Sequence, residues 1–290
     1  MIEDRMRWPE KRQLLGVRLS VTDYDAAVAA ICEAARRGEG GAVAAVAIHA
    51  VVLGTVQSRV GAWVDSLDLA TPDGQGLRWA LNWLHKSRLR DRVYGPELAL
   101  RLAREAAKEG LGLFLYGSTP EVAGRMKEVL EARFENLRIV GVHSPPFRAL
   151  TPEEEASDLL RIRDSGAHIV LVGLGSPRQE AWVVKHRAKS VATLVAVGAA
   201  FDFLSGNKRQ APVWMQRRGL EMVFRVMSEP RRLWRRFVYY SVPFVPLVLL
   251  QKLGLAEFPR PGEARLLGWT VRIERGSQRQ SGRPGSATEP

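Results

Sequence analysis

A carboxylate follows a short apolar run in the segment from Asp68 to Leu77, which reads DLATPDGQGL. Leu67–Ala70 is typical of a strand, Pro72-Asp73-Gly74 is typical of a turn, and helical spacing resumes at Leu77. In open α/β sheets, ligands bind where strands end and helices begin, so Asp73 is a candidate general base. The alternative is that Asp73 only caps the following helix with its side chain.

A glycine-containing loop, Gly173-Leu-Gly175-Ser176, follows the apolar run Ile169–Val172, and a helix is predicted to begin at Pro177. Glycines let backbone amides approach a ligand, and the positive end of the helix would face the loop, an arrangement that suits a diphosphate. The third glycine of a dinucleotide fingerprint would fall at Arg178, which disfavours a nicotinamide dehydrogenase. An ordinary strand-to-helix turn remains the alternative.

Two further strand ends carry similar residues. Phe201 and Asp202 end the stretch VGAAFD, where Asp202 either accepts hydrogen bonds from a base or ribose or caps a short helix; the other strand end is Gly117-Ser118-Thr119. Three such loops on one sheet edge predict a single ligand crevice. His49 ends the first central strand, Val43–Ile48, and is a candidate to face this crevice, although a lone histidine is more often structural.

The sequence predicts no metal site. Asp23-Tyr24-Asp25 has the D-x-D form of some metal-binding sites, but it follows Thr22 and precedes an alanine-rich helical run, so helix capping explains it better. The five histidines are scattered, and Cys32 is the single cysteine of the 290 residues. One cysteine excludes an internal disulfide and suits a reducing compartment. The first residues are charged and lack the apolar run of a signal peptide, which indicates a cytosolic main domain.

Strand-like and helix-like segments alternate from about residue 14 to residue 205, which predicts an α/β fold with a mostly parallel sheet covered by helices on both faces. The further predicted strands are Leu113–Tyr116, Ile139–Val142, Ile169–Val172 and Leu194–Val197. The predicted helices are Asp23–Arg37, Pro96–Glu109, Pro120–Phe134, Pro152–Ser165 and Pro177–Lys189.

The character of the chain changes near Gly206. Residues 207–240 hold nine basic residues and two acidic ones, a large share of the net charge of +12. The uncharged stretch Phe237–Leu250 follows, and it is too short for a bilayer-spanning helix, which needs about 20 residues. Interleaved arginines and aromatic residues predict a helical appendage on an anionic membrane surface, with nucleic acid as the competing partner. We therefore predict a core at 1–205, a membrane-associating appendage at 206–258 and a disordered tail at 259–290.

Five motifs, in order along the chain, resemble the WecG/TagA/CpsF glycosyltransferases of bacteria. They are Asp68–Gly76 (DLATPDGQG), Arg92–Leu98 (RVYGPEL), Gly173–Trp182 (GLGSPRQEAW), Val197–Gly206 (VGAAFDFLSG), and Gly219–Arg225 (GLEMVFR) with Glu229–Arg232 (EPRR). The resemblance runs from about Leu14 to Phe237. It implies a Rossmann-like enzyme that transfers a hexose, often of the N-acetylmannosamine type, from a UDP-sugar with inversion and without a metal or other cofactor.

The resemblance also implies an acceptor sugar on a polyprenyl diphosphate at the cytoplasmic face of the inner membrane, and no nucleic acid partner. The family's aspartate matches Asp73, and its appendage arginines match Arg225, Arg232 and Arg235. Together with the loops, this gives UDP-binding candidates Gly173, Gly175, Ser176, Phe201 and Asp202, and further substrate-binding candidates His49 and Gln179.

Two positions depart from the family pattern. The usual Thr-x-Asn at the end of the first central strand is Ala47-Ile48-His49 here, which bears on the sugar recognised. The usual Arg-Ala-Pro is Gln210-Ala211-Pro212. A second hypothesis is a non-catalytic α/β protein that binds a membrane surface or nucleic acid, and the sequence leaves open whether the chain is a homo-oligomer.

Overall fold

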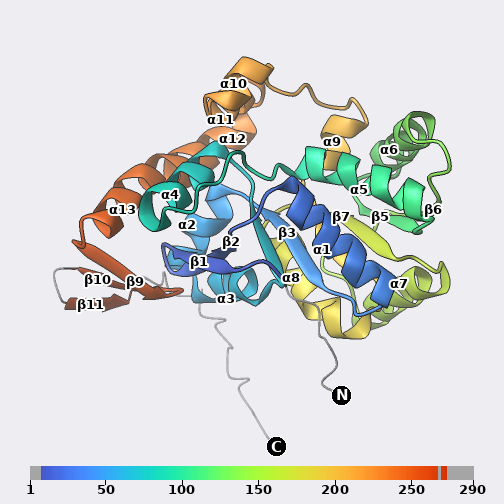
Figure 1. Ribbon diagram of the computed structural model, residues 1–290, viewed down its shortest axis with the longest axis horizontal. Coiled ribbons are helices and arrows are strands. Elements are labelled where there is room, and N and C mark those ends of the chain that lie inside the picture. Colours follow the sequence, from blue (N-terminus) through green and yellow to red (C-terminus); the bar gives the residue numbers. More distant parts are fainter. Residues whose placement is uncertain (1–7, 267–268, 273–290) are drawn as a thin grey trace, which may run out of the picture.

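The computed structural model describes residues 8–266 and 269–272, and it is built around a six-stranded sheet (Figure 1). The strand order is β4-β3-β8-β7-β5-β6, and all neighbours run parallel. The strands are β3 Ala42–Val46, β4 Leu69–Pro72, β5 Leu113–Gly117, β6 Ile139–His143, β7 Ile169–Gly173 and β8 Thr193–Ala196. The predicted α/β fold is confirmed.

Alternate strand residues face opposite layers, which explains why the strands are apolar throughout. Ile169 and Leu171 pack with one cluster of buried side chains, while Val170 and Val172 pack with the other. A parallel sheet covered on both faces requires apolar residues at successive positions. One layer contains α1 (Tyr24–Arg37), α5 (Gly95–Glu109) and α6 (Pro120–Arg133); the other contains α2 (Ile48–Val56), α3 (Ser58–Ser66), α4 (Gln75–His85), α7 (Pro152–Asp164) and α8 (Arg178–His186).

Hydroxyl and carboxylate side chains cap the N-termini of α1, α6 and α7. Thr119 accepts from the Val122 amide at the start of α6, and Thr151 forms a reciprocal capping box with Glu154 at the start of α7. Asp23 accepts a hydrogen bond from the Ala26 amide and so caps α1. Helix capping therefore explains the D-x-D sequence.

The first central strand is shorter than predicted. It ends at Val46, and α2 begins at Ile48, so His49 lies in the first turn of a helix and not at the end of a strand. Apolar runs are compatible with either element, and here the run continues into a buried helix. Helix α2 packs on α3 and on the antiparallel hairpin β1 (Lys11–Leu14) and β2 (Val17–Ser20).

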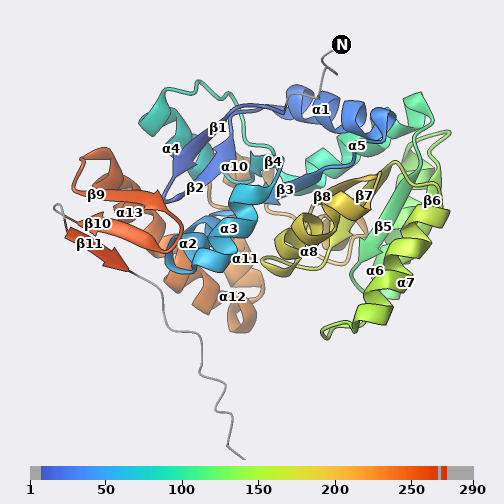
Figure 2. The same ribbon diagram turned by 90° about the horizontal axis from the view of Figure 1, so that it is seen from below.

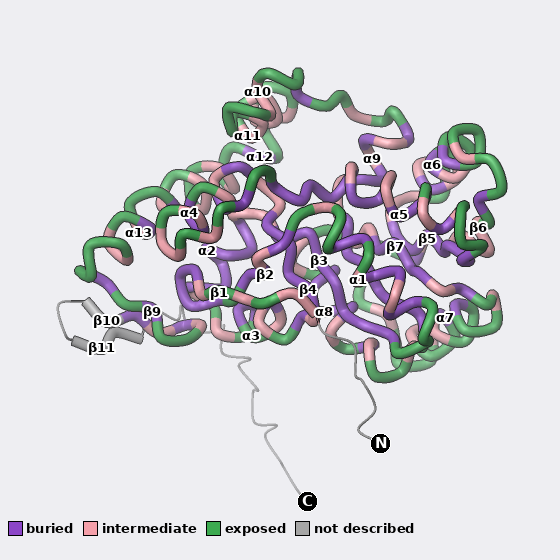
Figure 3. The backbone as a smooth tube through the Cα atoms, in the orientation of Figure 1, coloured by how far each residue is buried: buried purple, intermediate pink, exposed green. Residues whose placement is uncertain are grey.

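The appendage follows α9 (Ala200–Leu204) and consists of α10 (Val213–Arg217), α11 (Glu221–Ser228), α12 (Pro230–Arg236), a π-helical turn (Phe237–Ser241) and α13 (Val242–Lys252). Figure 3 shows exposed and half-buried residues along most of it, in contrast to the buried sheet. No helix in the described part of the chain is both long enough and apolar enough to cross a membrane.

The prediction of disorder from residue 259 is wrong for the residues that the structure describes. Strands β9 (Ala256–Arg260), β10 (Glu263–Leu266) and β11 (Trp269–Arg272) form an antiparallel sheet, which lies at the opposite end of the molecule from β6 (Figure 2). Phe258 and Ala264 are buried against the core, and the Gly262 amide donates to the Thr55 carbonyl. These few contacts hold a segment whose composition is otherwise that of a loop. Residues 273–290 lie outside the described residues.

Candidate active site

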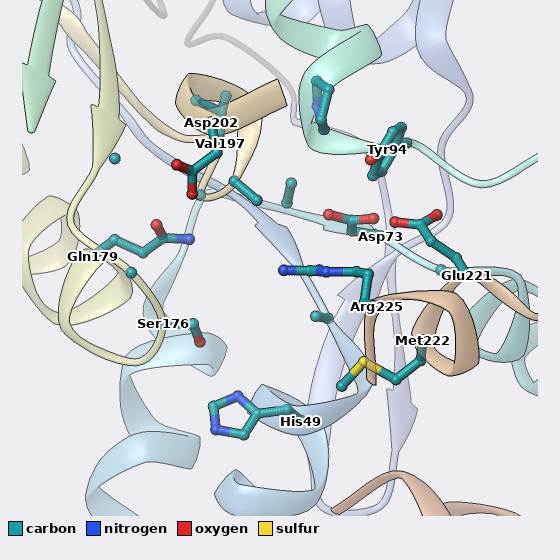
Figure 4. Close-up of a pocket in the computed structure, with 18 of the residues that line it drawn as sticks. His49, Asp73, Tyr94, Ser176, Gln179, Val197, Asp202, Glu221, Met222 and Arg225 are labelled. Carbon is teal, nitrogen blue, oxygen red and sulfur yellow. The ribbon is translucent and has the colours of Figure 1, made fainter. Parts of the chain in front are cut away.

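A cavity of about 420 Å³ lies at the carboxyl ends of β3, β4, β5, β7 and β8, and α11 and α12 of the appendage cover it. Figure 4 shows residues that line it. The cavity brings together nearly all the residues predicted from separate motifs: His49, Asp73, Gly173, Gly175, Ser176, Gln179, Phe201, Asp202, Arg225 and Arg232. The predicted single crevice is therefore present.

Asp73 lies on the cavity wall and does not cap the helix that follows it. Gly74 is the N-cap residue of α4, and no side chain in the described chain caps that end. Instead, the Asp73 carboxylate accepts a weak hydrogen bond, at 3.4 Å, from the amide of Gly95 at the start of α5. The backbone amide of Asp73 donates to the Val46 carbonyl, which fixes the turn beside β3. This carboxylate thus belongs to the lining of the cavity.

Burial raises the pKa of Asp73 from its ordinary value to about 7. The positive charge of Arg92 opposes this rise, and the negative charge of Glu221 adds to it. The Gly95 amide and Arg225 favour the charged form more weakly. A carboxylate with a pKa near neutrality is suited to accept a proton in one step and release it in the next.

Arg92 and Glu221 form an ion pair of 2.7 Å beside Asp73, and the two side chains are only 7% and 12% exposed. Arg92 also donates to the Gln216 side chain at 3.0 Å and lies 4.2 Å from the centre of the Tyr94 ring. Arg92 and Tyr94 come from the core, while Gln216 and Glu221 come from the appendage. The sequence did not single out this anchor. The sequence feature that could have indicated this ion pair is Glu221, an acidic residue in a strongly basic segment.

The glycine loop owes its shape to close packing. A Cβ atom on Gly173 would lie 2.5 Å from the Phe201 ring, and one on Gly117 would lie 2.7 Å from the Gly173 backbone. Gly175 has a φ of +77° and open space around it. Gly173 therefore allows Phe201, which is 1% exposed, to pack beneath the loop, whereas Gly175 faces the cavity.

We expect Gly173→Ala to destabilise the protein by about 1–3 kcal/mol, because the added methyl group must displace the buried Phe201 ring. Thermal unfolding checks this. Gly124→Ala is the matched control, since Gly124 lies within α6 with no atom within 4 Å of its added Cβ, and alanine favours a helix. A Gly173→Ala variant as stable as wild type would contradict the packing role.

Gln179 and Asp202 face the cavity from α8 and α9. Gln179 is 2% exposed, and its Oε1 atom has no hydrogen-bond partner in the described residues. Asp202 accepts a hydrogen bond of 2.7 Å from Asn207 and pairs with Lys208 at 3.2 Å. It does not cap α9, whose N-cap residue is Ala199. Gln179 therefore offers a buried acceptor, and Asp202 a carboxylate already held in place.

Some of the arginines of the appendage face the cavity. Arg225, Arg232 and Arg236 line the cavity. Arg235 is not among the lining residues of this cavity; it lies 5.5 Å from the centre of the exposed Trp234 ring. At about 100° per residue, positions 235 and 236 fall on opposite sides of Arg232 along the helix, and the cavity is on the side of Arg236.

His49 is 8% exposed, and it accepts a hydrogen bond of 2.9 Å at Nδ1 from Arg236. Burial and the positive charge of Arg236 lower the pKa of His49 to about 3. Figure 4 shows His49 at one end of the cavity and Asp73 at the other, with the Arg225 side chain between them. No group of three or more histidine, cysteine, aspartate or glutamate side chains that could hold a metal ion occurs in the described residues.

The geometry gives one cleft with a proton-accepting carboxylate, a glycine loop at a helix N-terminus and several guanidinium groups. Comparison with known protein families agrees with this arrangement. Residues 12–257 match the glycosyl transferase WecG/TagA/CpsF family, which covers the sheet, the cleft and the appendage helices. This match favours a transferase over the alternative of a non-catalytic scaffold. The chain belongs to the WecG/TagA/CpsF family of glycosyl transferases.

Proposed function

We propose that the protein is an inverting, metal-independent hexosyltransferase. It moves a sugar from a UDP-sugar, of the N-acetylmannosamine or glucose type, to a sugar on a polyprenyl diphosphate in the synthesis of a bacterial surface polysaccharide. The observation that carries the proposal is the Asp73 carboxylate, with a pKa of about 7, in the same cavity as a helix N-terminal loop and three arginines of the appendage.

Asp73 acts as the general base. The acceptor hydroxyl must lose a proton as it attacks the anomeric carbon, and a carboxylate within about 3 Å of that hydroxyl takes the proton. Only the ionised carboxylate can accept the proton, so the fraction of active enzyme increases as the pH rises through the pKa of Asp73. The Arg92–Glu221 pair beside Asp73 holds the wall of the cavity on this side.

The leaving UDP carries the charge that develops during transfer. The loop from Gly173 to Gln179 opposite Asp73, together with Phe201 and Asp202, surrounds UDP. Backbone amides near the start of α8 donate hydrogen bonds to its diphosphate. Guanidinium groups stabilise the same charge, which is why no metal is required. Attack from the side of Asp73, with departure toward the loop, inverts the anomeric centre.

The acceptor diphosphate lies against Arg225 and Arg232, and its lipid reaches a membrane at the outer side of the appendage. There, exposed apolar side chains extend from α12 to the end of α13: Trp234, Val238, Tyr239, Val242, Val245, Leu249 and Leu253. These apolar side chains and the basic residues of the appendage together suit an anionic lipid surface rather than nucleic acid. The enzyme accordingly works as a peripheral protein on the cytoplasmic side of the inner membrane.

We expect the double variant Val245→Asp/Leu249→Asp to lose binding to anionic vesicles, since both side chains are exposed on α13 and an added carboxylate is repelled by the lipid. Flotation with phosphatidylglycerol vesicles measures this. Val191→Asp, at an exposed apolar position outside the appendage, is the matched control and should float like wild type. Equal flotation of all three proteins would remove α13 from the membrane contact.

The test of the function is transfer itself. The protein is incubated with a panel of UDP-hexoses and a short-chain polyprenyl diphosphate bearing one sugar, with and without a chelator. We expect one preferred donor, release of UDP, and activity that survives the chelator. We also expect a product whose anomeric configuration, determined by NMR, is opposite to that of the donor. Retention of configuration, or dependence on a divalent metal, would overturn the corresponding part of the proposal.

A further inference from the structure

The hydrogen bond between His49 and Arg236 joins the two parts that form the cavity. His49 belongs to α2 of the core and Arg236 to the end of α12 in the appendage. Arg236 Nη2 lies 2.9 Å from His49 Nδ1, and the Tyr240 ring packs edge-on against the imidazole at 4.8 Å. The appendage thus contacts His49 through both a hydrogen bond and a ring. Both His49 and Arg236 line the cavity that contains Asp73.

The direction of this hydrogen bond determines the charge of the pair. A guanidinium group only donates, so His49 Nδ1 is the acceptor and the imidazole carries its proton on Nε2. The ring is neutral, and it orients Arg236 without cancelling its charge. An aspartate or glutamate in that place would hold the guanidinium as well but would neutralise it.

Arg236 is left with binding capacity that the protein does not use. Its Nε atom is buried and has no hydrogen-bond partner among the described residues. A buried, unsatisfied donor on a cation is costly and is relieved by an anionic oxygen. Burial and the nearby charge of Arg225 lower the pKa of Arg236 to about 10, and the nearby Glu180 carboxylate opposes this shift, so Arg236 stays charged at neutral pH. These conditions favour a ligand with two or more negative oxygens.

We propose that His49 is a positioning residue: as a neutral acceptor, it fixes the Arg236 guanidinium so that its remaining donors bind the diphosphate of a substrate. This inference rests on the proposed function, because both substrates of such a transferase carry a diphosphate. It also gives a physical role to His49, which stands where the family usually has asparagine. Its Nδ1 atom accepts a hydrogen bond from the appendage at the cavity.

The test compares two amides at position 49. Asparagine places its oxygen close to the position of Nδ1, whereas glutamine places it near that of Nε2. We expect His49→Asn to bind diphosphate ligands nearly as wild type does, and His49→Gln to bind about ten- to hundredfold more weakly. Isothermal titration with UDP and, separately, with farnesyl diphosphate measures this. The probe that is affected shows whether the donor or the acceptor diphosphate contacts Arg236.

Two further variants separate positioning from a structural role. His49→Asp keeps a partner for Arg236 but cancels its charge, so it should weaken binding as His49→Gln does. Arg236→Gln should weaken the same probe, and adding His49→Gln to it should have little further effect. Thermal unfolding shows that each variant is folded.

Two outcomes are decisive and distinguishable. If the wild type binds a diphosphate and all position-49 variants bind it equally, this inference is wrong while the proposed function stands. If the wild type binds neither UDP nor farnesyl diphosphate, both are overturned.

Discussion

Replacing Asp73 with asparagine is expected to lower the rate of sugar transfer by about 10²–10⁴-fold while leaving the affinity for UDP nearly unchanged. The amide keeps the shape of the side chain but cannot accept the proton of the acceptor hydroxyl. Steady-state kinetics and UDP titration of the same preparation measure the two quantities. Asp25→Asn is the matched control, because that side chain is 94% exposed and lies outside the cavity lining. Full activity of Asp73→Asn would remove this carboxylate from the mechanism.

The same residue sets an expected pH profile. Since the pKa of Asp73 is raised to about 7, kcat/KM of the wild type should rise with pH through about 7 as the carboxylate ionises. Stability changes in the opposite direction: the folded protein binds the Asp73 proton more tightly than the unfolded chain, so stability from this group is lost as the pH rises toward 7. Asp73→Asn should therefore be at least as stable as wild type at pH 8.

Replacing Glu221 with alanine is expected to destabilise the contact between core and appendage by about 3–5 kcal/mol, because Arg92 would be left buried without its ion-pair partner. Urea unfolding and trypsin cleavage at the many arginines of the appendage report this loss. Glu221 also raises the pKa of Asp73, so the remaining activity should shift to lower pH. Loss of an ordinary surface ion pair would cause neither this loss of stability nor this shift in the pH profile.

The matched control removes both charges. In Arg92→Met/Glu221→Leu, apolar side chains of similar size replace the pair, and such replacements are often neutral or stabilising. This double variant should regain most of the stability lost in Glu221→Ala. If Glu221→Ala unfolds like wild type, the Arg92–Glu221 pair does not hold the appendage to the core.

Regular elements were predictable because local rules determine them. The apolar runs became parallel strands, and the helices predicted to begin at Pro120 and Pro152 do begin there. The short strands β9–β11 were not predictable, because they depend on a few buried residues such as Phe258 and on pairing between segments of polar composition. At Ile48 the apolar pattern was compatible with both strand and helix, and packing in the second layer decided for the helix.

The sequence by itself determined which chemistry is present: a carboxylate in a turn after a strand, glycine loops before helices and a basic appendage, all at strand ends that a parallel sheet must bring to one edge. Only the tertiary structure decided how the appendage meets that edge. It placed Arg236 rather than Arg235 in the cavity, paired Arg92 with Glu221, and joined His49 to a residue far along the chain. The physical reason is that local patterns fix which way a side chain faces on its own element, whereas contacts between distant segments depend on how the elements pack.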